Sequence, residues 1–315
     1  MATSGSTDFS QNRDQIIADA LQLLGVIGSG ETATANDVTF CSNALNKMIK
    51  GWQAQGIHLW KETDGFVQLV EDQFKYTLTS SDKAGDNPIE TTLNAAASAS
   101  ATSLTVVSTT GMTAADNISI ELDANTNHNT TIVSVDSATT LTITSGIATA
   151  AASGNRVTVY TTALTRPLNI IECRYHYRSG LERKMKKLGR SEYMSLPTKT
   201  TSEGPCTAFY YSPRLSNGFL YVWPVPNETG DNLHITYTKT FEDFDAAGND
   251  PDFPQEWLDC ITYNLAVRVA PAFGLTLSRV NPDIIQTAGV LLAEMQAWDS
   301  EEGSIKITPN YRWDI

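Results

Sequence analysis

The stretch that decides the fold is Phe253-Pro254-Gln255-Glu256-Trp257-Leu258-Asp259-Cys260-Ile261-Thr262-Tyr263-Asn264-Leu265-Ala266-Val267-Arg268-Val269-Ala270-Pro271. Pro254 stands where a first helical turn accepts proline, and Glu256 lies near the positive end of the helix dipole. Pro271 has no backbone N–H and ends or kinks the helix after Val269. Between these signals, apolar residues recur at helical spacing and predict one buried face, made of Trp257, Ile261 and Leu265.

Two more helices are predicted near the start of the chain. Residues 10–24 form the first, with Ser10 as its N-cap, because a side-chain oxygen there can accept from an unpaired backbone N–H. The second begins at Thr34, has an acid three residues later, and ends at Gly56. Its apolar residues step by three and four, as an amphipathic helix requires: Val38, Cys41, Leu45, Met48 and Trp52.

A final helix is predicted to begin at Asn281-Pro282-Asp283, which supplies a cap, a first-turn proline and a first-turn acid. Gly303 is expected to close it. Helices from both ends of the chain therefore pack into one bundle around residues 253–271. The expected bundle core consists of Val38, Leu45, Met48, Trp52, Trp257, Ile261, Leu265, Ile285 and Leu292.

Alternating apolar residues predict strands between the two helical ends. Residues 66–70 and 74–78 are expected to form two strands joined by Glu71-Asp72-Gln73. Further strands are expected at 168–171, 174–177, 209–211, 219–223 and 233–237.

Residues 88–163 have a different composition. No Lys or Arg occurs between Pro88 and Arg156, and Thr, Ser and Ala dominate. Such bias also fits disorder, but Val, Ile and Leu recur at period two and favour a small all-β module. Its short strands are expected at 104–107, 118–122, 131–135, 141–144 and 157–160.

The predicted fold class is therefore α+β. The N- and C-terminal helices form a bundle, and a central β region carries the small all-β domain as an insertion. The expected organisation is a core of residues 1–87 and 164–303, an inserted module of residues 88–163, and an extended C-terminal tail of residues 304–315.

Composition excludes several classes of function. The chain of 315 residues has a net charge of −13, which argues against a surface that grips DNA phosphates. No apolar run is long enough to predict a membrane span. The first residues lack the basic and apolar regions of a signal peptide.

Motifs for chemistry are not evident. We predict no catalytic residues, no metal site and no cofactor, because the histidines His58, His128, His176 and His234 have no Cys or His at ligand spacing. The four cysteines are far apart in sequence, so buried free thiols in a reducing cytoplasm are favoured over a disulfide or a zinc site. An acidic run at Asp299, Glu301 and Glu302 is better explained as a solvated helix end than as a glycosidase pair.

Two segments are candidate contact sites. A basic segment comprises Arg183, Lys184, Lys186, Lys187 and Arg190. It could contact a phosphate backbone or an acidic partner, or it could be the solvated side of an amphipathic turn, since Leu181, Met185 and Leu188 fall at helical spacing.

The C-terminal tail is the second candidate. It alternates and is rich in aromatic residues, but it is too short to bury them by itself. It either packs on its own domain or adds to a neighbour as an extended strand. The candidate docking residues are Ile305, Ile307, Pro309, Tyr311, Arg312 and Trp313.

The order of several segments resembles a known family. These segments are Asn46–Trp60, Pro167–Ile171, Tyr193–Pro197, Phe219–Pro226, Phe253–Trp257 and Tyr263–Ala266. Together they resemble the head-to-tail adaptor proteins of short-tailed bacteriophages, also called tail accessory factors or packaged-DNA stabilisation proteins. Residues 90–163 depart from a minimal adaptor and resemble small β modules inserted into phage structural proteins.

The resemblance implies a virion structural protein of the neck and tail region, made in the host cytoplasm. Such adaptors form a ring of identical copies, usually twelve-fold, that docks under the portal protein and extends the DNA channel. Packaged DNA would pass through the lumen without sequence-specific binding, to which the acidic balance is suited. The ring would hold the genome before ejection and meet a tail nozzle or hub protein, or a tail fibre. The tail of residues 304–315 would be the portal-docking arm.

Two other classes of function stay open. The inserted module could bind a glycan or host surface, although Tyr160 at its edge is its sole Tyr, Trp or Phe. A cell-wall hydrolase would need a carboxylate pair in a cleft, which a sequence alone does not reveal.

Overall fold

The structure is a computed structural model that describes residues 5–57, 59–78, 84–86, 88–276 and 279–299. It confirms the α+β class, with a bundle built from both chain ends and a β region that carries an inserted β domain. The chain divides into two compact units. The first comprises residues 1–61 and 241–315, and the second comprises residues 62–240.

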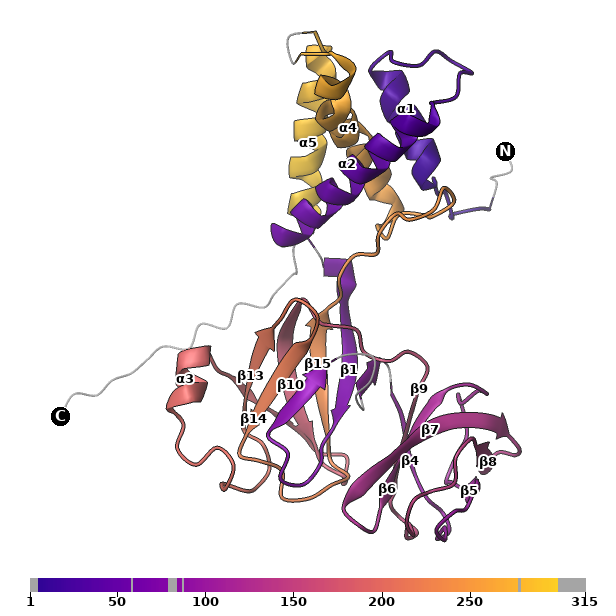
Figure 1. The fold of residues 1–315 in the computed structure, drawn as a ribbon, viewed down its shortest axis with the longest axis vertical. Coiled ribbons are helices and arrows are strands. Elements are labelled where there is room, and N and C mark those ends of the chain that lie inside the picture. The colour runs from indigo at the N-terminus through magenta and orange to yellow at the C-terminus, as the bar shows by residue number, and fades with distance from the viewer. Residues whose placement is uncertain (1–4, 58, 79–83, 87, 277–278, 300–315) are drawn as a thin grey trace, which may run out of the picture. The chain divides into compact units, whose positions relative to one another are not determined.

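The first unit is helical (Figure 1). Its elements are α1 (Arg13–Leu23), α2 (Ala35–Ala54), η1 (Leu59–Lys61), η2 (Gln255–Trp257), α4 (Leu258–Val269), η3 (Ala270–Phe273) and α5 (Pro282–Trp298). Helix α4 packs against α1, α2 and α5. Seven of its twelve residues are buried, so the predicted central position of this helix is confirmed.

The ends of α4 follow the proline signals. A 3-10 turn, η2, follows Pro254 and leads into the helix. After Val269 the backbone tightens into η3, and Gly274 ends it in the left-handed region at φ 73°, where glycine has no steric penalty.

The caps of α1 and α2 differ in how well they could be predicted. Thr34 caps α2 and accepts from the backbone N–H of Asp37, as expected. The prediction that Ser10 caps α1 is wrong. Asn12 is the cap, because it exchanges side-chain hydrogen bonds with Gln15 in a capping box.

Helix α5 begins at the predicted Asn281 cap, and one residue of its predicted inner face, Ile285, is misplaced. Ile284, not Ile285, packs against the bundle core, together with Leu292 and Met295. Successive residues of a helix are about 100° apart, so Ile285 lies beside the core-facing stripe that Ile284 begins. The helix ends at Trp298, with Asp299 as its C-cap, before the predicted stop at Gly303.

The other predicted core residues lie where they were expected. Six of them are buried by at least 94% of their surface: Leu45, Met48, Trp52, Trp257, Ile261 and Leu265. Val38 and Leu292 are half-buried at the margin of the same core.

An aromatic cluster surrounds Trp257, which is fully buried. Its ring centroid lies 5.9 Å from that of Trp52, 5.1 Å from that of Trp60 and 5.5 Å from that of Phe253. Phe241 stacks on Phe253 at 4.6 Å and completes the cluster. Offset and edge contacts of this kind add to the hydrophobic gain of burial.

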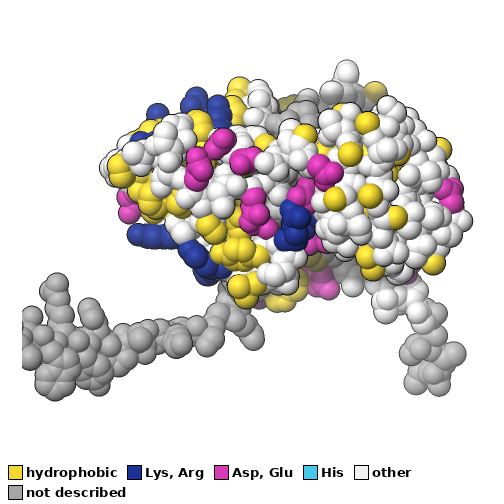
Figure 2. Space-filling view, turned by 90° about the horizontal axis from the view of Figure 1, so that it is seen from below, with side chains coloured by type: hydrophobic (Ala, Val, Ile, Leu, Met, Phe, Trp, Pro, Cys, Tyr) yellow, Lys and Arg dark blue, Asp and Glu magenta, His cyan; other side chains and the backbone are white. Residues whose placement is uncertain are grey.

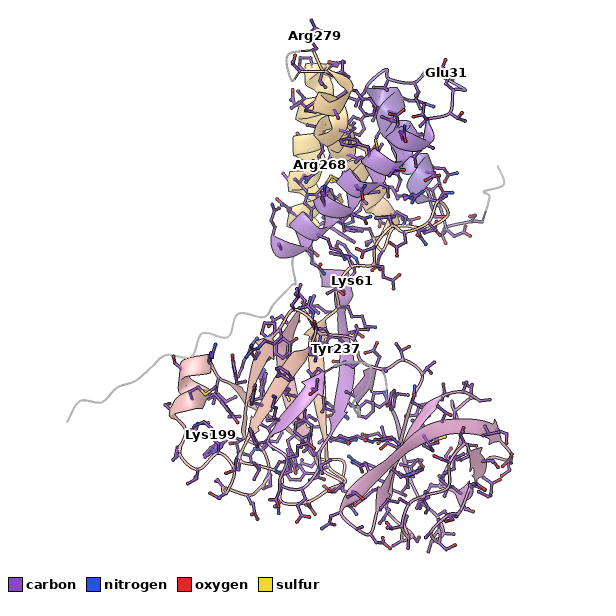
Figure 3. The ribbon with its side chains drawn as sticks, in the orientation of Figure 1. Glu31, Lys61, Lys199, Tyr237, Arg268 and Arg279 are labelled. Atoms are coloured by element: carbon purple, nitrogen blue, oxygen red, sulfur yellow. The ribbon has the colours of Figure 1, made fainter. Side chains whose placement is uncertain are left out.

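The second unit contains two sheets that face each other and a separate module. Its elements outside the module are β1 (Glu62–Gln68), β2 (Lys75–Leu78), β3 (Ala84–Asp86), β10 (Asn169–His176), β11 (Glu182–Lys184), β12 (Lys186–Lys187), α3 (Arg190–Ser195), β13 (Ala208–Pro213), β14 (Gly218–Trp223) and β15 (Asn232–Thr238). The five-stranded sheet has the order β11-β10-β15-β1-β3, and the four-stranded sheet has the order β12-β13-β14-β2. A single core joins the two sheets. It includes Tyr237 of β15, labelled in Figure 3, and Leu220 of β14.

The two strands predicted at residues 66–70 and 74–78 are present as β1 and β2, but they do not pair with each other. Strand β1 pairs with β15 and β3, whereas β2 pairs with β14 in the other sheet. Asp72, at φ 60°, lies in the turn between them. Alternation identifies the buried face of a strand but not its partner, so both strands were found and their pairing was not.

Two further predictions, one of strands and one of an amphipathic turn, need correction. Residues 168–171 and 174–177 were expected as two strands, but they form one strand, β10, with a register shift between Ile170 and Glu172. The amphipathic turn expected around Met185 is also wrong. The segment forms the short strands β11 and β12, and Met185 is buried while Leu181 is 65% exposed.

The inserted module is a six-stranded sheet with its own core. Its strands are β4 (Ile89–Thr92), β5 (Ser103–Thr105), β6 (Asn117–Leu122), β7 (Thr126–Val135), β8 (Thr140–Ile143) and β9 (Arg156–Tyr160), in the order β4-β9-β6-β7-β8-β5. All five runs predicted in this segment correspond to strands, and β4 was not predicted. The core contains only residues of this segment, among them Ile118, Leu141 and Val157.

Gly85 permits a close approach between β3 and the end of the module. A Cβ at this position would lie 2.3 Å from Cδ2 of Tyr160, whose ring packs on Phe66. We expect Gly85→Ala to lower the free energy of unfolding by about 1–3 kcal/mol, the usual cost of overpacking. Chemical denaturation should show a smaller loss when the same change is made in a Tyr160→Ala background.

Gly51 provides the control for that measurement. It lies within α2, and nothing comes within 4 Å of an added Cβ. Gly51→Ala should leave stability unchanged or raise it by up to about 1 kcal/mol, since alanine is the better helix former. Equal losses in the two variants would contradict the overpacking explanation.

Within the described residues, the structure contains no helix of the length and apolar character that a membrane crossing requires.

Candidate functional site

The sequence-predicted contact residues have different outcomes. The tail residues Ile305, Ile307, Pro309, Tyr311, Arg312 and Trp313 lie outside the described part of the chain. The residues of the basic segment are exposed on β11, β12 and the start of α3.

Two of the basic side chains are held by contacts with β10, Lys184 from the same sheet and Lys187 from the facing one. Lys184 Nζ lies 2.8 Å from Glu172 Oε2. Lys187 Nζ donates to Asn169 Oδ1 at 3.0 Å and to the carbonyl oxygen of Ile170 at 2.6 Å. Arg183, Lys186 and Arg190 are left as the charges best placed to meet a partner. Figure 2 shows Lys and Arg side chains gathered over the two facing sheets and a nearly uncharged surface over the module.

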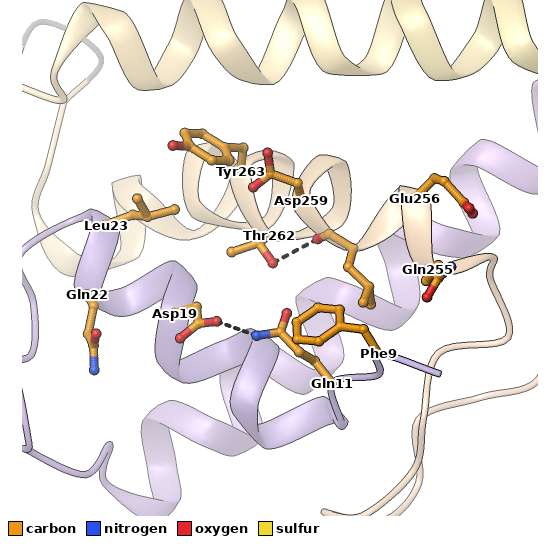
Figure 4. Close-up of a pocket in the computed structure, with 11 residues that line it drawn as sticks. Phe9, Gln11, Asp19, Gln22, Leu23, Gln255, Glu256, Asp259, Thr262 and Tyr263 are labelled. Carbon is orange, nitrogen blue, oxygen red and sulfur yellow. Dashed lines mark hydrogen bonds between the residues drawn. The ribbon is translucent and has the colours of Figure 1, made fainter. Parts of the chain in front are cut away.

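A hollow in the first unit lies between α1 and α4 (Figure 4) and has a volume of about 620 Å³. Acidic side chains line it, namely Asp19, Glu256 and Asp259. Asp19 accepts a hydrogen bond from Gln11 Nε2 at 2.8 Å, and no basic side chain lines the hollow. Its chemistry suits a positively charged segment, but the hollow brings together no acid–base or nucleophile pair.

A close group of titratable side chains lies where the module meets the five-stranded sheet. Glu90 comes from β4 of the module, His176 from β10 and His234 from β15. In the pairing of β10 with β15, His176 is opposite Asn232 and Arg174 is opposite His234. The two histidines are therefore diagonal neighbours on the outer face of the sheet, which Glu90 covers from the module.

The three side chains are close and mostly buried. Glu90 Oε2 lies 3.2 Å from His176 Nδ1, and Glu90 Oε1 lies 3.5 Å from His234 Nε2. The imidazole rings stack with centroids 4.2 Å apart. The exposed fraction is 12% for the His176 side chain and 21% for each of the other two.

The environment shifts the pKa of each group. Burial opposes the charge of Glu90, but its hydrogen bonds with His234 and Asn232 and the charges of Arg156 and His176 outweigh burial and lower its pKa to about 2. Burial lowers the pKa of His176 despite the nearby Glu90 carboxylate. For His234, burial is outweighed by Glu90 and Glu182, and its pKa is raised.

Further charged side chains surround this cluster and form ion pairs with its members. Glu182 Oε1 lies 2.6 Å from His234 Nδ1, and its Oε2 lies 3.3 Å from Arg174 Nε. Arg156 Nη1 lies 3.8 Å from Glu90 Oε1. A hollow of about 340 Å³ reaches the cluster at His234 and is also lined by Arg174 and Asp64.

A second polar group fixes the module beside this cluster. Glu121 of β6 is 8% exposed, pairs with Arg178, and accepts a hydrogen bond from the backbone N–H of Arg156 at 2.9 Å. Ser119 Oγ donates to Gln68 Oε1 of β1 at 2.6 Å. Buried polar contacts therefore dock the module on the sheet, together with the packing of Tyr160 on Phe66.

The cysteines and Tyr160 are all buried. The four cysteines are buried free thiols, as expected, and burial raises the pKa of Cys41 to about 11 and that of Cys260 to about 12. Tyr160 is 8% exposed, so the one aromatic side chain at the edge of the module is not available for stacking on a sugar.

Sequence reasoning did not find the cluster of Glu90, His176 and His234. The three residues are 86 and 58 positions apart along the chain, since 176 − 90 = 86 and 234 − 176 = 58. The alternation in residues 174–177 and 233–237 indicates that His176 and His234 point away from the core, and this was the signal that the sequence offered. The pairing of those strands, which alternation does not specify, is what brings the histidines together.

Comparisons with known proteins add little to this geometry. No family model matches the chain, and no curated protein matches it. Among solved structures, the chain is similar to VP17, a capsid protein of bacteriophage P23-77, with 12% sequence identity over 58% of this chain and 76% of that one. The TM-score is 0.12, and a likeness of that size carries no argument about fold or function.

Proposed function

We propose that the chain is a structural component of a phage virion, a ring-forming head-to-tail adaptor. It would dock under the portal protein, extend the DNA channel and connect to the tail. The proposal rests on the order of segments that resembles such adaptors and on a bundle built from both chain ends. In this role the protein acts by binding its neighbours and performs no catalysis.

One observation carries the ring-forming part of the proposal. Helix α5 has 17 residues, of which only Asp283 and Glu294 are charged, yet Ala288 is its single fully buried residue. Val290 is 47% exposed and Trp298 is 54% exposed. An apolar helix face of this kind marks an interaction surface, and we assign a second copy of this chain as its occupant.

The negative net charge of the chain is compatible with a channel protein. The net charge of −13 disfavours tight binding of the DNA backbone and so permits DNA to slide. Glycan binding by the module is the weaker candidate, because its edge aromatic residue is buried.

A test of assembly begins with Val290→Glu. A charge on the α5 face should abolish ring formation on portal rings of the same virus, because burying an unpaired carboxylate in an apolar interface is costly. The mass of the protein, alone and mixed with portal rings, measures this. Val290 is half-exposed in the single chain, so folding should be preserved.

Leu215→Glu is the matched control, since Leu215 is 97% exposed and lies outside the bundle. It should assemble like the unaltered protein. A third form lacking residues 304–315 tests portal docking, and its undiminished assembly would overturn the docking-arm role. If Val290→Glu assembles normally, α5 is not the ring interface.

A further inference from the structure

We propose that Glu90, His176 and His234 form a binding site for one divalent transition-metal ion, with zinc as the reference ion, at the junction of the inserted module and the five-stranded sheet. The ligand atoms of the three residues lie within 4.8 Å of one another. The inference is independent of the adaptor function.

The spacing of the atoms suits a single ion. Zinc bonds to His nitrogen and carboxylate oxygen are about 2.0–2.2 Å long, so neighbouring ligand atoms of a tetrahedral ion are about 3.3–3.5 Å apart. Glu90 meets the two histidines through different oxygens, Oε2 at 3.2 Å from His176 Nδ1 and Oε1 at 3.5 Å from His234 Nε2, and both separations are of the size found between ligands of one ion. Three protein ligands would leave a fourth position for water.

One ring nitrogen has an unmet bonding requirement. Nδ1 of His176 is buried and lacks a hydrogen-bond partner within the described structure, although Glu90 Oε2 is only 3.2 Å away. The two atoms are close but not aligned for a hydrogen bond. An ion held by both would satisfy the nitrogen lone pair and the carboxylate together.

His234 already has a carboxylate behind its ring, as histidine ligands of metal ions commonly do. Nδ1 of His234 lies 2.6 Å from Glu182 Oε1, which orients the ring and leaves Nε2 facing Glu90. A carboxylate behind a histidine ligand fixes its tautomer and raises its basicity. Glu182 is therefore assigned as a positioning residue and not as a ligand.

Local charge permits a cation. Three carboxylates, of Glu90, Glu182 and Asp64, lie in this group against two guanidinium groups, of Arg156 and Arg174. Arg156 also donates to the carbonyl oxygen of Tyr177 at 3.2 Å, so it has another partner when an ion occupies Glu90. Two imidazoles and one carboxylate favour zinc, nickel or copper over magnesium or calcium.

An ion at this site would link the module to the sheet. Glu90 belongs to β4, whereas both histidines belong to the sheet beneath it. Binding to the folded form alone would stabilise the docked module in proportion to zinc concentration.

The test is a calorimetric titration of the chelator-treated, full-length protein with zinc chloride. One ion per chain is expected, and His176→Gln and His234→Gln should each weaken binding at least tenfold. His128→Gln is the control, because His128 lies on β7 of the module, away from the cluster, and contacts Ser145. Glu182→Gln should weaken binding by about tenfold to a hundredfold, as expected for an orienting carboxylate.

A second measurement guards against misfolded variants. Cobalt chloride in place of zinc should give the intense visible absorption of a four- or five-coordinate site, and Glu90→Gln should abolish it while thermal unfolding in chelator stays cooperative. The proposal is overturned if the unaltered protein binds no zinc. It is equally overturned if both histidine variants bind zinc as tightly as His128→Gln does.

Discussion

Replacing Trp257 with alanine is expected to lower the free energy of unfolding of the helical unit by about 3–5 kcal/mol, the usual cost of removing a large aromatic side chain from a packed core. Trp257 is fully buried and contacts the rings of Trp52, Trp60 and Phe253. The loss includes the transfer of its own surface and the cavity left among those rings. Urea denaturation followed by helix circular dichroism measures it.

The effect should be confined to one unit. The core around Trp257 contains only residues of 1–61 and 241–315. Hydrogen exchange should therefore rise in α1, α2 and α4, while β10 and β15 keep their protection. Equal loss of protection in the strands would contradict this division.

Trp298→Ala is the matched control. The same atoms are removed from the same unit, but Trp298 is 54% exposed on α5. Surface substitutions of this kind change stability by about 0.5 kcal/mol or less. A loss as large as that of Trp257→Ala would show that burial does not explain the difference.

Helices with strong end signals were predictable. Thr34 and the pair Asn281-Pro282 correctly indicated where α2 and α5 begin, because a cap acts locally and needs no tertiary partner. The start of α1 was misplaced because Ser10 and Asn12 are both good caps. Only the reciprocal bond from Gln15 distinguishes them.

The choice between Ile284 and Ile285 in α5 shows a second limit. Ile284 and Ile285 are both apolar, and Leu291 follows Val290 and precedes Leu292. An evenly apolar helix has no sharply defined buried face. The same evenness leaves Val290 exposed, which is the surface that the ring proposal uses.

The pairing between strands was the feature that the sequence predicted least well. The module was found because its alternating runs stand alone in a segment without Lys or Arg. The cluster of Glu90, His176 and His234 was not found, since it depends on the register of β10 with β15 and on which face β4 covers. Those long-range choices are set by packing, not by local pattern.

Glu121→Leu is expected to cost about 2–4 kcal/mol and to loosen the module on its sheet. Glu121 is 8% exposed, pairs with Arg178 and accepts from the backbone N–H of Arg156. Removing one partner of a buried pair leaves the other groups without their bonds. The cost stays below the upper range for such pairs because the Arg178 side chain is 42% exposed and can regain water.

Glu71→Leu separates this effect from a general loss of charge at the junction. Glu71 is half-buried and accepts from the neutral amide of Asn125 of the module at 2.6 Å, so its loss should cost about 1 kcal/mol or less. Denaturation gives the free energies, and limited proteolysis at the ends of residues 88–163 reports the docking. Glu121→Leu should be cleaved faster than Glu71→Leu. Equal cleavage and equal stability of the two variants would contradict the prediction. They would mean that the apolar parts of the junction, and not the buried pair of Glu121 and Arg178, hold the module on its sheet.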